Sequence, residues 1–440
     1  MMGKRLYIET WGCQMNRHSS EGIAGILDRV GFTLTSTPSE ADVVVFNTCA
    51  VRQKAEEKVY GRIGVIAKLK EEKNIVFGVG GCMAQVRGEA LLRRFPVIDF
   101  LFGTAELSAL PKILCKVGAR RRQIAHLPNP TGMEEFFYRR ESLATAMVTI
   151  TQGCSNFCSY CIVPYARGPL RSRSREEIVA EIGGLRKAGY KEVLLLGQNV
   201  DAYGRDNPDY GDFPGLLAEV AQTGIQRVRF TTSHPRDITP RVLETIAEEE
   251  NICNHLHLAC QSGSDRILRV MNRGYTREAF LSIVEKAREM VEGVNLTTDL
   301  IVGYPGESER DFRATMELIE RARFGSIFVA KYSPRPGTRS ALVPDDVPDD
   351  VKDMRLQEVL IRQREIAVEE NRQRIGQVVR VLVEGRTRNG AFHGRGDDHR
   401  TVVLSGDAEI GTFVPVRIEA ASAAALKGQV LVPVTARGAL

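Results

Sequence analysis

The sequence has no long hydrophobic run: no window approaches the roughly 20 apolar residues that a membrane-spanning helix needs. Its first residues, MMGKRLYIETWGCQMN, contain no apolar segment like that of a secretory signal. Neither sign of charge dominates, because 60 Lys and Arg residues face 55 Asp and Glu residues and leave a net charge of +5. We therefore expect a cytoplasmic protein without a membrane partner. Its mild basicity permits an acidic or nucleic-acid partner without requiring one.

Disulfide bonds are not expected either, although the chain has nine cysteines, because the cytosol keeps thiols reduced. Cysteines at patterned spacings in such a protein more often bind metal or carry out chemistry. Their positions along the chain are therefore the strongest guide to function.

The chain is long enough for about three domains, and its pattern changes accordingly along the 440 residues. Apolar strands alternate with helices over residues 1–120, which predicts a parallel sheet of the Rossmann or flavodoxin type. Residues 121–141 lose this rhythm and are predicted to be a linker. A second α/β series over 142–375 predicts a partial (β/α) barrel, although an open doubly wound sheet has the same pattern. Short strands between turns over 376–440 predict a small antiparallel β-barrel.

Individual elements follow from the same patterns. In the first domain we expect strands at 5–10, 42–48, 74–80 and 98–103, and helices at 20–30, 55–70 and 84–94. In the last domain we expect four strands, at 377–385, 400–404, 413–420 and 429–434.

The most specific motif is TQGCSNFCSYCIVPYARG, in which Cys154, Cys158 and Cys161 form a C-x3-C-x2-C pattern. Three thiolates on one short loop are able to hold three irons of a 4Fe–4S cluster and leave the fourth iron open. The open iron is able to chelate the amino and carboxylate groups of S-adenosylmethionine, a cofactor that carries radical chemistry. A structural zinc site usually needs four ligands, and no fourth is nearby in sequence. The alternatives are an incomplete zinc knuckle or three unrelated core cysteines.

This motif resembles that of the radical S-adenosylmethionine superfamily, whose fold is a partial barrel. The resemblance implies that Tyr160, the aromatic residue before the last cysteine, lies beside the adenine of the cofactor. It also implies that residues at the glycine-containing strand ends support the rest of that molecule. In this sequence the matching residues are Gly197, Gln198, Asn199, Gln261, Ser262, Gly303 and Pro305.

Three further cysteines, Cys13, Cys49 and Cys82, each follow a predicted parallel strand and precede a helix. Because the carboxyl ends of parallel strands face one crevice, these cysteines are expected to meet in space. The positive end of each helix favours thiolates and an anionic cluster. The positions therefore predict a second metal cluster, whereas purely structural cysteines would more naturally lie within the strands.

The arrangement resembles the methylthiotransferase family of radical enzymes along nearly the whole chain. That family joins a cluster-binding domain, a radical barrel and a TRAM domain, which is a small RNA-binding β-barrel. The resemblance implies that Cys13, Cys49 and Cys82 hold an auxiliary 4Fe–4S cluster that carries the sulfur to be transferred. In that family, one S-adenosylmethionine methylates that sulfur and a second supplies the radical. We expect Cys115, Cys253 and Cys260, which match no such spacing, to be small buried hydrophobic residues.

Branches of this family modify isopentenylated adenosine in tRNA, threonylcarbamoylated adenosine in tRNA, or an aspartate of a ribosomal protein. The motifs that look most like the first branch are GCQMN (12–16), NTCAVRQKAEEKV (47–59), CSNFCSYCIVPYARG (154–168), QSGSDRILRVMNRGYT (261–276) and YSPRPGT (332–338). One departure is Ser19, where relatives commonly carry Asp. The other two branches remain alternatives, as does a non-enzymatic iron–sulfur or zinc protein that binds RNA.

Clustered arginines also indicate RNA, because such groups neutralise phosphates. The candidates are Arg167, Arg171, Arg173 and Arg175; Lys116, Arg120, Arg121 and Arg122; and Arg386, Arg388, Arg395 and Arg400. We expect the partner to be the anticodon stem-loop of a tRNA. We also expect a reducing electron donor such as flavodoxin, and a monomer.

Overall fold

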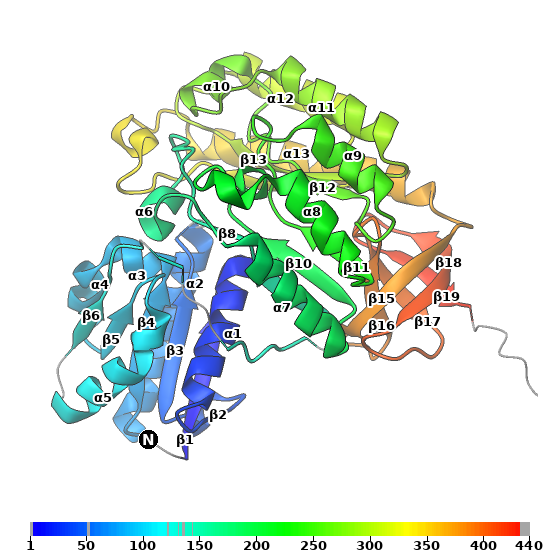
Figure 1. The fold of residues 1–440 in the computed structure, drawn as a ribbon. Coiled ribbons are helices and arrows are strands. Elements are labelled where there is room, and N and C mark those ends of the chain that lie inside the picture. The colour runs from blue at the N-terminus through cyan, green and yellow to red at the C-terminus, as the bar shows by residue number, and fades with distance from the viewer. Residues whose placement is uncertain are drawn as a thin grey trace, which may run out of the picture.

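The computed structural model describes residues 3–50, 53–120, 123–130, 132–133, 137–142 and 144–431. Three bodies follow one another along the chain (Figure 1): an α/β domain in blue and cyan, a larger central α/β body in green and yellow, and a small barrel in orange and red. No helix in these ranges combines the length and apolarity needed to cross a membrane.

The N-terminal domain is built on a six-stranded, all-parallel sheet with the order β2-β1-β3-β4-β5-β6. The strands are β1 (Lys4–Thr10), β2 (Phe32–Leu34), β3 (Val43–Thr48), β4 (Val76–Gly81), β5 (Phe100–Phe102) and β6 (Ile124–His126). The helices are α1 (Gln14–Asp28), α2 (Gln53–Glu72), α3 (Cys82–Arg87), α4 (Glu89–Arg94) and α5 (Leu110–Arg120). This is the flavodoxin-like strand order, in which the order reverses between β1 and β3 and ligands bind at that switch point.

Three details of this domain differ from the sequence prediction. Strand β6 lies inside the predicted linker and pairs with β5, so the sheet continues past residue 120. The expected helix at 84–94 is divided at Gly88, whose φ of +54° is incompatible with a continuous helix. Helix α1 begins at Gln14 rather than at residue 20.

The central body is a partial barrel of six parallel strands in chain order. The strands are β7 (Thr145–Thr149), β10 (Glu192–Leu196), β11 (Arg227–Phe230), β12 (His255–His257), β13 (Asn295–Val302) and β14 (Ser326–Lys331). They form two three-stranded sheets, and a parallel bridge between Ser233 and Leu258 joins β11 to β12. Because the strands follow in order without a reversal, the open doubly wound alternative is wrong.

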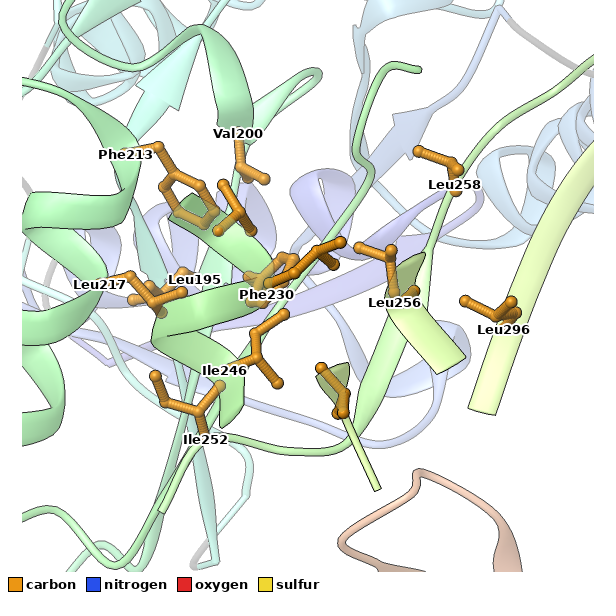
Figure 2. Packing of buried hydrophobic residues seen from close by; sticks show 14 of the residues in the cluster. Leu195, Val200, Phe213, Leu217, Phe230, Ile246, Ile252, Leu256, Leu258 and Leu296 are labelled. Carbon is orange, nitrogen blue, oxygen red and sulfur yellow. The ribbon is translucent and has the colours of Figure 1, made fainter. Parts of the chain in front are cut away.

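The outer face of this barrel is covered by helices. They are α7 (Arg175–Lys187), α8 (Phe213–Gln222), α9 (Pro240–Glu248), α10 (Asp265–Val270), α11 (Arg277–Met290) and α12 (Glu309–Ala322). Figure 2 shows the core between strands and helices, where Leu195 and Phe230 pack against Phe213 and Leu217. These aromatic and aliphatic side chains are almost fully buried. This packing keeps the strand ends in place, and the strand ends carry the candidate site.

Helix α13 (Asp349–Arg372) leads from the central body into a closed five-stranded barrel. Its strands are β15 (Val378–Arg386), β16 (Phe392–Gly396), β17 (Thr401–Ser405), β18 (Phe413–Ala421) and β19 (Leu426–Val430). The barrel is not wholly antiparallel as predicted, because β17 and β19 run parallel. Strand β16 is an addition to the four predicted strands, and part of the last predicted strand lies outside the described residues.

The C-terminal barrel docks on the amino ends of the central strands (Figure 1). Glu192, at the start of β10, accepts hydrogen bonds from both Arg227 and Arg229 of β11. Arg227 also donates to the Arg395 carbonyl of β16 at 2.8 Å. The Asn295 side chain at the start of β13 donates to the Asp398 carbonyl at 2.8 Å. The two bodies therefore share one buried polar network.

Candidate metal centres at two sets of cysteines

The loop that carries Cys154, Cys158 and Cys161 is closed at its base by a short hairpin. Strand β8 (Thr151–Gln152) pairs with β9 (Arg171–Ser172) in antiparallel register. Within the loop, the Cys154 N–H donates to the Gly168 carbonyl at 3.1 Å and the Cys161 N–H donates to the Cys158 carbonyl at 2.9 Å. The three thiols are thereby gathered at the carboxyl end of the barrel, above β7.

A second segment of the barrel, after α10, holds the tip of this loop. The Ser159 N–H donates to the Met271 carbonyl at 2.9 Å, and the Asn272 side chain donates to the Phe157 carbonyl at 3.0 Å. Arg273 is buried and donates from Nη1 to the Cys158 sulfur at 3.3 Å and to the Tyr160 hydroxyl at 3.4 Å. Arg273 was not among the residues selected from the sequence, although it lies in the quoted motif at 261–276.

The thiols of this set lie close enough to influence one another. Burial, and then the charges of Cys158 and Cys154, raise the pKa of the Cys161 thiol to about 12. Burial also raises the pKa of Cys154, with Cys158 adding to the effect. The set thus consists of three mutually close, largely buried sulfurs with one guanidinium beside them. That composition fits a cluster bound by three thiolates, since metal binding replaces the thiol protons.

Unpaired polar atoms surround the same strand ends. Thr151 Oγ1, Asn199 Oδ1 and His234 Nε2 are buried, and among the described residues they have no hydrogen-bond partner. A buried polar atom without a partner costs about 1–3 kcal/mol, so this cost is recovered when a polar ligand binds. A cavity of about 270 Å³ lies next to Cys154 and Asn199. These features suit a cofactor with amino, carboxylate and ribose groups.

The residues expected to contact this cofactor lie in different surroundings. Tyr160 packs with Tyr304 and Tyr332 beside the loop. The side-chain oxygen of Gln198 accepts the Gly153 N–H, so this residue supports the cysteine loop itself. Gln261 and Ser262 are buried just beyond β12. Gly197 faces Thr151, Gly303 faces the Lys352 side chain of α13, and Pro305 is buried in the next turn. Cofactor contact at all these positions remains a prediction.

Cys13, Cys49 and Cys82 follow three neighbouring strands, β1, β3 and β4. Cys13 precedes α1, Cys49 directly follows β3, and Cys82 is the first residue of α3. A Cβ atom placed on Gly12 would lie 2.8 Å from the Cys49 Cβ, which shows how closely the first two strand ends approach. The cysteines therefore gather at the switch point of the sheet, where ligands bind in folds of this type.

Arg167 is largely buried and lies against these cysteines. It is only 4% exposed, and it lies within electrostatic range of Cys82, Cys13 and Cys49. RNA contact at Arg167 remains a prediction, and its surroundings show that neighbouring arginines in sequence need not share a surface. Cys82 itself packs with Ile162 and Ala166 of the loop between β8 and β9 that carries Cys154, Cys158 and Cys161, which we call the radical loop. The segment 162–166 therefore lies between the two cysteine sets.

No three His, Cys, Asp or Glu side chains in the described ranges converge on the position of a single metal ion. Cysteines that bind a 4Fe–4S cluster bind separate irons and need not surround one point. No observation in this part of the chain therefore favours the single-zinc alternative. Of the remaining cysteines, Cys253 and Cys260 are buried as expected, whereas Cys115 is exposed on α5, contrary to the prediction.

Most of the other candidate RNA contacts already have protein partners. Arg171 donates to backbone carbonyls, Arg173 binds Glu181 at 2.7 Å and Arg175 binds Glu219 at 2.7 Å. Arg395 and Arg400 bind acidic side chains within the C-terminal barrel. Arg386 and Arg388 are exposed and remain candidates, while Arg121 and Arg122 lie outside the described residues, as does the Arg120 side chain.

Family models match each body of the chain. The Radical SAM superfamily matches residues 148–319, the uncharacterized protein family UPF0004 matches 5–103, and the TRAM domain matches 372–431. A tRNA-2-methylthio-N(6)-dimethylallyladenosine synthase of Carboxydothermus hydrogenoformans is 46% identical, over 95% of this chain and 97% of that protein. The chain belongs to this family. The protein of the same name in Caldicellulosiruptor saccharolyticus is 43% identical, over 97% of this chain and 93% of its own length.

The family membership establishes a radical S-adenosylmethionine enzyme of the transferase class, with a 4Fe–4S cluster and S-adenosylmethionine as cofactors. The fold agrees with this. The radical S-adenosylmethionine methyltransferase TsrM of Kitasatospora setae, whose structure holds cobalamin and a [4Fe-4S] cluster, superposes with a TM-score of 0.59. At 14% identity over 77% of each chain, this similarity concerns the fold alone.

Proposed function

We propose that this enzyme adds a methylthio group to C2 of isopentenylated adenosine, next to the anticodon of a tRNA on its 3′ side. The substrate is the one named for relatives that align along nearly the whole chain. The C–H bond at that position is unactivated, so ionic substitution is difficult. When bound, the cluster and S-adenosylmethionine supply the radical that takes hydrogen from this bond.

The roles of the protein's own residues follow from their positions. Cys154, Cys158 and Cys161 would hold the radical cluster, and Asn199 and His234 offer unpaired polar atoms to S-adenosylmethionine. Cys13, Cys49 and Cys82 would hold the auxiliary cluster that carries the sulfur. A tRNA loop presents its bases unpaired, so the target base is able to enter the space at the carboxyl end of the barrel. The C-terminal barrel would bind the RNA backbone.

The observation that carries the proposal is the meeting of the two cysteine sets. Cys82 packs on Ile162 and Ala166, which closely follow Cys161 in the radical loop. A sulfur donor bound by Cys13, Cys49 and Cys82 would therefore lie beside the site where the substrate radical forms. A reducing partner such as flavodoxin, a monomeric state and a cytoplasmic location belong to the same proposal.

Three substrates test the choice of target: isopentenylated tRNA, threonylcarbamoylated tRNA and the ribosomal protein. The reconstituted enzyme should modify the first fastest, as measured by mass spectrometry of nucleosides and peptides. Faster modification of either of the others would reject this branch but keep the methylthiotransferase chemistry. No product with any of the three would favour a protein that only binds RNA.

Two triple variants test the roles of the cysteine sets. Replacing Cys154, Cys158 and Cys161 by Ala should abolish 5′-deoxyadenosine formation and lower the iron content by one cluster. Replacing Cys13, Cys49 and Cys82 by Ala should also remove one cluster, yet it should preserve cleavage of S-adenosylmethionine and abolish methylthio product. If the second variant still formed product, the N-terminal cysteines would be structural only.

A further inference from the structure

Arg167 is the last residue of α6 (Val163–Arg167), the short helix that directly follows the radical cysteines. Its side chain reaches the N-terminal cysteine set. There it lies within electrostatic range of Cys82, Cys13 and Cys49, and the preceding residue, Ala166, packs on Cys82. One residue of the radical loop therefore touches the site that we assign to the sulfur donor.

The backbone around Arg167 is held from both domains. The Thr104 hydroxyl of the N-terminal domain donates to the Ala166 carbonyl at 2.6 Å. On the other side, the Gly168 carbonyl accepts the Cys154 N–H at 3.1 Å. Gly168 has a φ of +75°, and a Cβ there would lie 2.5 Å from the Pro130 carbonyl oxygen, so only glycine fits. Residues 166–168 thus connect the two cysteine sets through three consecutive positions.

The charge of Arg167 also requires a partner. It is buried, and among the described residues it forms no ion pair with a carboxylate; the titratable groups within its electrostatic range are Cys82, Cys13 and Cys49. An uncompensated buried charge is strongly destabilising. A cluster with three thiolate ligands is anionic and would supply the missing charge. Arg140, by contrast, is buried at the same domain interface but pairs with Glu21 and Glu181.

We propose that Arg167 is a positioning residue that holds the auxiliary cluster against the radical loop, by donating hydrogen bonds to its thiolates and by offsetting its negative charge. This inference rests on the proposed function, because it requires the auxiliary cluster. Removing the guanidinium would leave the cluster's negative charge less compensated. Since reduction adds further negative charge, the cluster should become harder to reduce.

The test uses the full-length chain with Cys154, Cys158 and Cys161 replaced by Ala, so that only the auxiliary cluster is present. Arg167→Met and Arg167→Lys are introduced into this background, and the midpoint potential is measured by a spectroscopic redox titration. We expect the potential to fall in Arg167→Met and to fall less in Arg167→Lys, which keeps the charge but loses the planar guanidinium. The control Arg140→Met removes a buried arginine without a cysteine partner and should leave the potential unchanged.

Each outcome bears on a different claim. Unchanged potentials in both Arg167 variants would overturn the inference while leaving the auxiliary cluster established. Loss of the cluster from Arg167→Met, with an unchanged unfolding transition of the metal-free chain, would support it, because the arginine then holds the cluster and not the fold. If Arg167→Met and Arg167→Lys both unfolded in their metal-free forms, the inference would be overturned, since Arg167 would then stabilise the domain interface. If the unsubstituted background bound no iron at all, the proposed function itself would fail.

Discussion

The side chains of Asn16 and Asn47 hydrogen-bond each other between the strand ends that carry Cys13 and Cys49. Asn16 Nδ2 donates to Asn47 Oδ1 at 3.2 Å, and Asn47 Nδ2 donates to the Asn16 carbonyl at 2.8 Å. Both residues are buried, and Asn16 Oδ1 also accepts the Cys13 thiol at 3.4 Å. The asparagine pair thus fixes the spacing of two cysteines that are far apart in sequence.

Asn47→Ala should therefore weaken the N-terminal site specifically. Loss of these buried hydrogen bonds should lower the free energy of unfolding by about 1–3 kcal/mol, measured by urea denaturation of the metal-free chain. After reconstitution, iron content should fall while S-adenosylmethionine cleavage persists. The control Asn254→Ala removes an exposed hydrogen bond to the Glu292 carbonyl and should change neither quantity appreciably. Wild-type iron content in Asn47→Ala would show that the pair is not needed for the site.

Asp201 should make stability depend on pH. Burial, with the Asp237 carboxylate adding to it, raises the pKa of Asp201 to about 7. An unfolded aspartate ionises near pH 4, so between about pH 4 and 7 the unfolded chain loses a proton that the folded chain keeps. This contribution to stability is present below that range and is lost as the pH rises through it.

Asp201→Asn removes this ionisation but keeps an oxygen that accepts the His234 backbone N–H, which lies 3.0 Å from the carboxylate. The melting temperature of the variant relative to wild type should therefore be higher at pH 8 than at pH 4.5. Other titrating groups, His234 included, are common to both chains and largely cancel in this difference. The exposed Asp407→Asn serves as the control and should show the same difference at both pH values. A pH-independent difference for Asp201→Asn would contradict the assignment.

Glu192 should anchor the docking of the C-terminal barrel. Its carboxylate is fully buried between Arg227 and Arg229. Glu192→Ala would therefore leave both guanidiniums without this ion-pair partner. Breaking a buried ion pair on one side typically costs about 3–5 kcal/mol, which urea denaturation would detect. Glu285→Ala, which removes an exposed pair with Arg321, should cost less than about 1 kcal/mol. Equal effects of the two substitutions would show that the network contributes little.

Arg386 and Arg388 should supply part of the affinity for tRNA. Both are exposed on the C-terminal barrel, and Arg386 lies over the Phe392 ring at 3.6 Å. Replacing both by Ala should lower the log–log salt slope of binding by roughly 0.9 for each duplex phosphate that is no longer neutralised, or about 1.8 in total. Arg321→Ala, on the outer helix α12, should leave the slope unchanged. An unchanged slope in the double variant would place the RNA elsewhere.

Much of the architecture follows from local sequence patterns. Cys13, Cys49 and Cys82 could be grouped because parallel strands end on one edge of a sheet, whatever the loops between them do. The radical loop could be recognised because its three cysteines lie within eight residues. Strand β6 was missed because three residues in a proline-containing stretch carry too little periodicity to be seen.

Side-chain surroundings could not be predicted in the same way. Arg167 and Arg171 are four residues apart, yet one faces cysteines and the other donates to backbone carbonyls. Arg273 lies more than 100 residues from Cys158 in sequence but donates to its sulfur. The sharing of Glu192 by two arginines depends on the adjacent register of β10 and β11, and the contact of Arg227 with the C-terminal barrel depends on docking. These relationships are tertiary, and no local pattern encodes them.

The docking of the C-terminal barrel has a geometric consequence. It is attached at the Asn295 end of β13, whereas the cysteine sets lie toward the opposite ends of the strands. The eight residues of β13, at about 3.3 Å each, separate the two ends by roughly 25 Å. Arg227 and Asn295 hold the barrel at this end of the strands. If the barrel binds the RNA as proposed, the modified nucleotide would lie about this distance from the bound part of the RNA.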